Sequence, residues 1–506
     1  MSKGKNSIKK SKSTKQNRLG SSILQHYQLI ITLMFVYIST YYTVISNDFF
    51  LKWAEEFSLF VPTTYYFTQC MNLAGGFLTY AGTFLTQFFY YPAIGSFIFI
   101  AILFFIQYLS VIAFRIPTNY YPISFIPSLM LLLSITQLGY IWLVLKSPGY
   151  LFSNSLGVAV FLLLFITYRS LSNLTLRIVV LLLILVGGYP LFGFYALLTG
   201  LICLLYEFIL YLKDRNSSRT IPVITGLALI VSVPQLCYYF VYYNMQFIDI
   251  YLAGLPHFEF NSNEIPLWLP FIVLLVSFFW FSSFLLPKQD KITKHTKTTF
   301  ASTIAFISAI ILIYVMSYKD DNFTAGVKIY NAFEKNNWEE VIGLAQDLRE
   351  KPTDNIVKSY CIATLLAGHE VENNPVLNHD NTVKPNCVDN TVSLDVILGG
   401  MSFYYNSGEI NKCYRVCMEN TVEYGMRVSS LKYMVKCALV NEEYDLARKY
   451  NSILLSSMFH KEWARKYQYF IDNPTLTKDS YEMNLLRSLV ADKGQKQKPE
   501  FQQFDL

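Results

Sequence analysis

Asp48 is the acidic residue best placed to do chemistry near the N-terminus. It follows an apolar run that ends at Ile45, within the pair Asn47-Asp48. A carboxylate at the outer end of a first membrane helix lies where lipid meets water. There it can act as a general base or hold a metal beside a lipid-linked phosphate. Asp at a helix boundary is commonly a helix cap. Asp48 is therefore the catalytic candidate, and the alternative is that it only caps the helix.

A second group of polar residues lies between residues 244 and 266, a stretch without Lys or Arg. It contains Asp249, His257, Glu259 and Glu264. Carboxylates and imidazole are groups that bind a divalent ion or a sugar. The spacing matches no fixed ligand motif, so no metal site is assigned. Asp249, His257 and Glu259 are candidate substrate-binding residues, and the alternative is that they are solvated loop residues.

Glu207 is an acid inside an apolar run, which makes it a functional candidate by default. Lys213 and Arg215 follow closely, so the alternative is that Glu207 pairs with them. No P-loop, GxGxxG, HExxH or GxSxG motif is present, so ATP-driven transport and membrane proteolysis by those means are unsupported. The eight cysteines form no CxxC pair, which argues against zinc and redox motifs.

The elements that position these residues follow from composition. Of the 506 residues, 53% are hydrophobic and only 15% are charged, against about 25% in soluble domains. The charges gather in the first 18 residues and after Tyr318. This asymmetry predicts a membrane region followed by a soluble one. A basic segment directly before an apolar span indicates a cytoplasmic anchor facing anionic lipid, and no nucleic-acid partner is expected.

The membrane region, residues 27–318, is predicted from the rule that a helix needs about 20 apolar residues to cross a bilayer. Residues 1–26 form the basic cytoplasmic tail. The spans lie near residues 27–46, 72–91, 94–114, 122–145, 150–168, 174–190, 191–212, 220–243, 266–286 and 298–317.

Orientation follows the positions of Lys and Arg. The N-terminal tail, Lys213 to Arg219 and Lys288 to Lys297 are expected inside, and everything after Tyr318 outside. Seven spans would separate the N-terminal tail from Lys213, although an even number is needed. We expect residues 122–146 to be two short helices divided near Ile135-Thr136-Gln137, which gives eleven spans in place of ten.

Residues 319–490 show a helical period, with three short matches at Trp338, Ile410 and Tyr444. The last two are 34 residues apart, which is the tetratricopeptide period. We therefore predict a soluble α-solenoid of tetratricopeptide-like helical hairpins, with an ordinary helical bundle as the alternative. Asn373 to Asn390 is expected to be a long loop, and residues 491–506 a disordered tail. Five cysteines lie in this part of the chain; export would permit a disulfide there, and free buried thiols are the alternative.

The stretch from Asp48 to Pro92 resembles the polytopic glycosyltransferases of the GT-C class. It has an acid after the first span, an amphipathic loop segment, and then Gly75-Gly76 to Tyr90-Tyr91-Pro92. The resemblance implies that Asp48 is the catalytic acid, that the donor is a lipid-phosphate sugar, and that a divalent metal serves as cofactor. Lys52 and Arg427 would contact phosphate or acceptor. The class usually has a paired acid, whereas this chain has Asn47-Asp48. The chain also resembles an uncharacterised bacterial family of multi-pass proteins.

The sequence predicts an all-α protein of the cell inner (plasma) membrane, and two functions are compatible with it. The first is a GT-C-like transferase that moves a sugar from a lipid-phosphate carrier to an extracytoplasmic acceptor. The second is a non-enzymatic scaffold whose exported helical repeats dock a protein partner. A transporter would need a chain of buried polar sites, which the sequence lacks.

Overall fold

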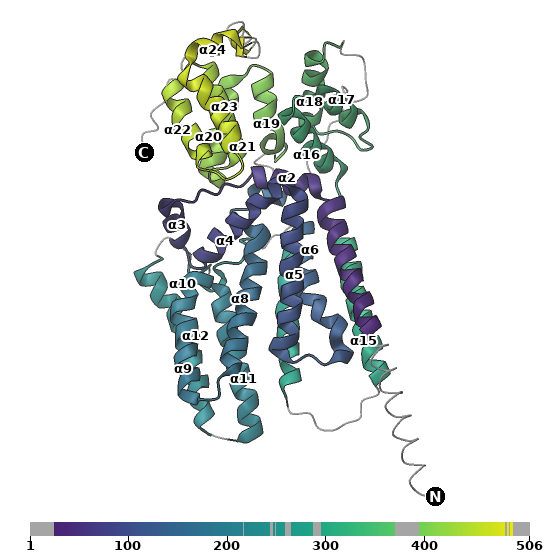
Figure 1. The fold of residues 1–506 in the computed structure, drawn as a ribbon, viewed down its shortest axis with the longest axis vertical. Helices are drawn as coiled ribbons and strands as arrows, with labels where there is room; N and C mark the ends of the chain where they lie inside the picture. Colours follow the sequence, from purple (N-terminus) through teal and green to yellow (C-terminus); the bar gives the residue numbers. More distant parts are fainter. Residues whose placement is uncertain are drawn as a thin grey trace, which may run out of the picture.

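The computed structural model describes residues 25–215, 217–242, 246–247, 249–258, 265–286, 295–369, 394–480, 483–484 and 486–488. Within these residues the chain is helical. Long helices form a bundle at one end of the molecule, and shorter helices form a compact domain at the other (Figure 1). Residues 1–24, the loop expected at 373–390 and the tail expected at 491–506 lie outside the described residues.

The long helices are apolar enough to cross a bilayer, and eight of them reach membrane length in the described part of the chain. Their lipid-facing sides carry exposed apolar side chains, such as Phe97 at 73% exposure and Phe240 at 80%. Eight of the ten expected spans therefore correspond to membrane-length helices. They are Gln25–Ile45, Pro92–Phe114 (α5), Tyr150–Ser170 (α8), Leu174–Phe192 (α9, Leu174–Leu182, to α10, Gly188–Phe192), Phe194–Asp214 (α11), Ser217–Phe240 (including α12, Thr220–Phe240), Ile265–Leu285 (including α14, Leu269–Ser282) and Lys297–Met316 (within α15, His295–Met316).

The expected span at 72–91 is not a membrane-length helix. Its α-helical part, α4 (Gly76–Thr86), has 11 residues, or about 16 Å at 1.5 Å per residue, whereas a bilayer core is about 30 Å thick. The chain enters α4 through Gly75, whose φ of 82° is left-handed. After the short turn Gln87–Tyr90 (η2), Tyr90 stacks on Phe459 of the C-terminal domain. Residues 72–91 thus end at the C-terminal domain without covering the bilayer thickness.

The expected span at 122–145 is interrupted after Thr136, and its second piece is not a membrane helix. Thr118–Phe125 (η3) continues into α6 (Ile126–Thr136), and the break follows Thr136. The next helix, α7 (Ile141–Val144), has four residues. The segment 118–136 runs parallel to α15, because Ser302 bonds the Asn119 carbonyl near one end and the Tyr318 amide bonds the Thr136 carbonyl at the other.

The C-terminal domain is a series of helices in which each packs on the next. The matches found in sequence begin helices α17, α20 and α22, and turns at Gly408 and Asn441 precede the last two. The starts of α19 and α21 are 34 residues apart, as are those of α20 and α22. The tetratricopeptide-like assignment itself stays a prediction. The helices are α16 (Asp321–Glu334), α17 (Trp338–Gln346), α18 (Asp354–Leu366), α19 (Leu394–Asn406), α20 (Ile410–Tyr424), α21 (Val428–Val440), α22 (Tyr444–Leu455), α23 (Lys461–Asp472) and α24 (Pro474–Asp479).

The seven described cysteines are free. Three of them, Cys413, Cys417 and Cys437, are fully buried where α20 packs on α21. Among the described cysteines of the C-terminal part, these three are free buried thiols, and Cys361 is free but only partly buried.

Candidate functional site

Helix α2 (Asp48–Glu56) joins the two halves of the molecule. Its apolar side chains, including Phe50 and Trp53, are buried, and both rings contact Phe323 of α16. The sequence indicated an amphipathic helix in this region. The structure agrees on the helix, but its apolar face packs against protein on both sides (Figure 1).

The two acids at the end of α2 are buried against the C-terminal domain. Glu55 Oε1 lies 2.9 Å from His460 Nε2, and both side chains are 3% exposed or less. Glu56 Oε1 lies 3.3 Å from Lys432 Nζ, and the Tyr330 hydroxyl donates to Glu56 Oε2 at 3.3 Å. These contacts join residues several hundred positions apart, so they fix the domain on the membrane region.

Burial and pairing have opposite effects on the pKa values of Glu55 and Glu56. Burial raises the pKa of Glu55 despite its hydrogen bond with His460. Burial also disfavours ionised Glu56, but Lys432 and then His460 outweigh it and lower the pKa of that carboxyl. At neutral pH, Glu56 and Lys432 therefore form a buried ion pair.

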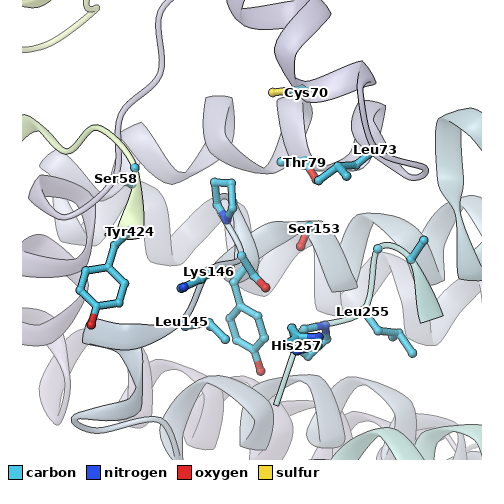
Figure 2. A pocket seen from close by; sticks show the side chains of 18 of the residues that line it. Ser58, Cys70, Leu73, Thr79, Leu145, Lys146, Ser153, Leu255, His257 and Tyr424 are labelled. Atoms are coloured by element: carbon cyan, nitrogen blue, oxygen red, sulfur yellow. The ribbon is translucent and has the colours of Figure 1, made fainter. Parts of the chain in front are cut away.

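A cavity of about 890 Å³ lies beside this junction, a volume within the range of small-molecule sites. Its wall combines the residues just after α2, helix α3 (Thr64–Met71), the 145–150 loop and the 249–258 segment with the turn that follows α20. Figure 2 shows Tyr424 and His257 on opposite sides, with Lys146 between them. Membrane region and C-terminal domain therefore both contribute to one cavity.

Asp249 and His257 form the acid–imidazole pair of the cavity. Asp249 begins the short helix α13 (Asp249–Leu252), and its Oδ1 lies 3.7 Å from His257 Nδ1. The His257 side chain is 66% exposed, so the ring is accessible from the cavity. This separation is longer than a hydrogen bond, so the carboxylate acts on the ring as a nearby negative charge, and the exposed imidazole is a group that can take part in acid–base chemistry.

Close backbone packing at three glycines holds this segment in place. Gly193 and Gly254 have φ values of 53° and 90°, and a Cβ on Gly193 would lie 2.1 Å from the Ala253 carbonyl oxygen. The Phe194 amide bonds that same oxygen at 2.7 Å. A Cβ on Gly75 would lie 3.2 Å from Gly254 Cα. The start of α4, the α10–α11 turn and the Asp249–His257 segment thus meet through their backbones.

The cavity wall also carries two basic residues from opposite halves of the molecule. Lys146 pairs with Glu423 at 2.5 Å, and more than half of each side chain is exposed. Arg427 is 4% exposed and donates from Nη2 to the Leu143 carbonyl at 2.7 Å. The sequence had suggested Arg427 as a contact for phosphate or acceptor. Lys146 was missed, although a lone Lys between two apolar runs was a usable signal.

The structure separates Asp48 from the other candidates. Asp48 is exposed in the first turn of α2. An acidic side chain is stabilised there by the positive end of the helix dipole. It does not line the cavity, whereas Asp249 and His257 do. Glu259 and Glu264 lie outside the described residues. Among the described residues, no group of His, Cys, Asp and Glu has a geometry that could hold a metal ion.

Glu207 lies at the opposite end of the membrane region and is fully buried. Its carboxylate pairs with Arg177 at 2.8 Å and with Arg219 at 3.2 Å, and it accepts from the Tyr168 hydroxyl at 3.0 Å. Lys213 and Arg215, the partners expected from sequence, are not those found. These contacts satisfy the acid and tie α8, α9 and α11 together, which is a structural role.

Apolar helices of membrane length, with a helical domain packed on one end, define a multi-pass helical membrane protein. The chain belongs to the family of unknown function DUF6057, whose profile matches residues 23–504. No glycosyltransferase or tetratricopeptide family matches it. Neither the search of curated proteins nor that of solved structures gives a match.

Proposed function

We propose that this protein is a membrane-embedded transferase that acts, at the outer face of the membrane, on a sugar carried by a lipid phosphate. The cavity that carries the Asp249–His257 pair, at the junction of membrane region and C-terminal domain, is the observation on which the proposal depends. It offers an acid–base pair, basic residues and a volume suited to a sugar.

The outer location is supported by the distribution of charge in the membrane region. Helices α5 and α8 begin near the C-terminal domain and the cavity, so Arg115 and Arg169 lie at the far end. Lys213 and Arg219 lie at that end too, beside the α11–α12 turn. Membrane loops rich in Lys and Arg face the cytoplasm, so the cavity and the C-terminal domain face outward.

The same reasoning supports an even number of crossings before Lys213. If residues 118–136 cross and residues 72–91 do not, six crossings precede Lys213, which puts it on the side of the N-terminal tail. The conflict in the sequence-based topology came from counting 72–91 as a span. The proposed topology has nine crossings in the described residues.

Labelling of single cysteines tests this orientation. In a variant whose native cysteines are replaced by Ser or Ala, we expect Glu350→Cys to react with a membrane-impermeant maleimide in intact cells. We expect Ser217→Cys to react only after the membrane is permeabilised, since both positions are exposed but lie at opposite ends of the molecule. Labelling of Ser217→Cys in intact cells would refute the orientation.

The proposed chemistry assigns a role to each residue of the pair. His257 accepts the proton of the acceptor hydroxyl as that oxygen attacks the anomeric carbon, and the lipid phosphate leaves with the electrons of the broken bond. Asp249 stabilises the imidazolium that forms through its nearby negative charge. Tyr65 and Leu73 line the cavity yet are 72% and 51% exposed, so they lie at its mouth, where a lipid chain could remain in the bilayer.

Comparison of lipid extracts tests the function. A strain lacking the protein should accumulate a sugar-bearing lipid phosphate, and the wild-type gene should restore its consumption. His257→Gln should fail to restore it, because a general base contributes about 10²–10⁴-fold to rate.

Asp48→Asn is the informative comparison. The cavity-based site predicts full restoration by Asp48→Asn, whereas catalysis by Asp48 predicts none. Unchanged lipid extracts in the deletion strain would contradict the transferase.

The scaffold alternative is less well supported. The face of the C-terminal domain that carries Tyr330, Lys432 and His460 already holds α2 of the same chain. A protein partner would have to use the remaining surface of the domain, where no observation points to a ligand.

A further inference from the structure

Arg427 is the charged residue of the cavity wall that lacks a partner of opposite charge. Lys146 has Glu423, and Asp249 has His257. Within the described part of the chain, no carboxylate lies at ion-pair distance from the Arg427 guanidinium. Its neighbours are the Leu143 carbonyl and the rings of Phe57 and Tyr424, at 5.2 and 5.0 Å.

This environment is costly for a cation. Burial lowers the pKa of Arg427 to about 10, so the side chain remains charged at neutral pH, and no carboxylate of the described residues neutralises it. Nη1 is buried and has no hydrogen-bond partner. Arg427 is also the N-cap of α21, at the positive end of a helix dipole, where an anion is favoured and a cation is not. Buried charges and buried donors normally have partners, so an anionic ligand would supply what Arg427 lacks.

A second unpaired donor lies in the same wall. Trp142 is 6% exposed, and its indole Nε1 is buried without a partner. Trp142 directly precedes Leu143, the residue whose carbonyl Arg427 bonds, and both Trp142 and Arg427 line the cavity. The two donors come from α7 and from the C-terminal domain, so a ligand between them would contact both halves of the molecule.

We propose that Arg427 and Trp142 form an oxyanion subsite that binds a phosphate group of the substrate at the inner wall of the cavity. The subsite deepens the proposed function and rests on it for its biological substrate, but anion binding itself does not require transfer. A phosphate suits the site because a tetrahedral oxyanion offers acceptors to donors that approach from two elements, and Arg is suited to phosphate geometry.

The phosphate could belong to a lipid headgroup or be free in solution, and the two sources are separable by experiment. Thermal unfolding is measured on the full-length protein in neutral detergent, with sodium phosphate against sodium chloride at equal ionic strength. It is measured again in nanodiscs of phosphatidylcholine with and without phosphatidylglycerol. We expect the midpoint to rise by several degrees in at least one arm, since a ligand that binds only the folded state stabilises it.

Arg427→Met keeps the apolar stem of the side chain and removes the charge. We expect it to abolish the shift while leaving the unliganded protein folded. Arg415→Met is the matched control, because Arg415 is an exposed residue of α20 paired with Glu419, and it should keep the full shift. If Arg427→Met does not fold, Trp142→Phe removes only the indole N–H and should weaken binding about tenfold.

Each outcome bears on the subsite. A shift with phosphate alone assigns a free anion, and a shift with phosphatidylglycerol alone assigns a lipid headgroup. No shift in either arm, or an equal shift in Arg427→Met and Arg415→Met, overturns the proposal. His257→Gln should retain the shift. An anion-binding protein without transferase activity would therefore refute the proposed function and leave the subsite standing.

Discussion

Lys432→Met is expected to destabilise the folded protein by about 3–5 kcal/mol, because it leaves the carboxylate of Glu56 buried without its cation. Lys432 and Glu56 are 6% and 7% exposed, so water does not replace the lost partner. Burial would then raise the pKa of Glu56, and the carboxyl would take up a proton on folding. The measurement is thermal or denaturant unfolding of the purified protein, followed by intrinsic tryptophan fluorescence, to which buried Trp53 contributes.

Two comparisons identify the cause. The double variant Glu56→Gln/Lys432→Met removes both charges and should recover most of the loss. Arg448→Met breaks ion pairs of α22 whose side chains are half exposed or more, and should change stability by less than about 1 kcal/mol. A Lys432→Met protein as stable as the wild type would mean that the buried ion pair does not secure the domain.

Gly193→Ala should disrupt the fold around the cavity. The added Cβ would lie 2.1 Å from the Ala253 oxygen, and φ at this position is 53° with ψ at −127°, which disfavours any side chain. To accept the methyl group, the 249–258 segment must move away from α11 and lose the 2.7 Å bond from the Phe194 amide. We expect a loss of about 3 kcal/mol or more, together with loss of the Asp249–His257 geometry.

Gly187→Ala is the matched control, since the same change is made six residues earlier. No atom lies within 4 Å of the place where its Cβ would stand, and its φ is −83°. Because Ala favours a helix by up to about 1 kcal/mol over Gly, this variant should be as stable as the wild type or slightly more so. Equal stabilities of Gly193→Ala and Gly187→Ala would contradict the importance of the glycine junction.

The membrane helices could be predicted from sequence because each depends on a local property, an apolar run long enough for the bilayer. Residues 122–145 divided into shorter helices, and residues 72–91 departed furthest from the expectation. Their composition is apolar enough for a span, but Gly75 introduces a left-handed turn and the helix that follows is short. The run is apolar for a different reason, since residues such as Leu78 and Phe89 pack inside the protein.

The candidate site was predictable only in part. Asp249 and His257 could be found because they lie in a stretch that has acidic residues and a His but no Lys or Arg. Their distance from Asp48, and the contribution of Tyr424 and Arg427 to the same cavity, depend on contacts between segments far apart in the chain. Glu55 and Glu56 show the same limit. Their partners lie beyond residue 320, and no local pattern in the sequence indicates that pairing.

The position of α2 has a consequence for how the polypeptide matures. Helix α2 leaves the ribosome early, whereas Lys432 and His460 follow several hundred residues later, so the receiving surface cannot close until synthesis is nearly complete. A C-terminal fragment produced by itself would expose the partly apolar surface that normally contacts α2, and Lys432 on that surface would lack its acidic partner. Such a fragment should aggregate or recruit acidic helices from unrelated chains, and a synthetic peptide covering Asn47 to Ser58 should suppress both behaviours.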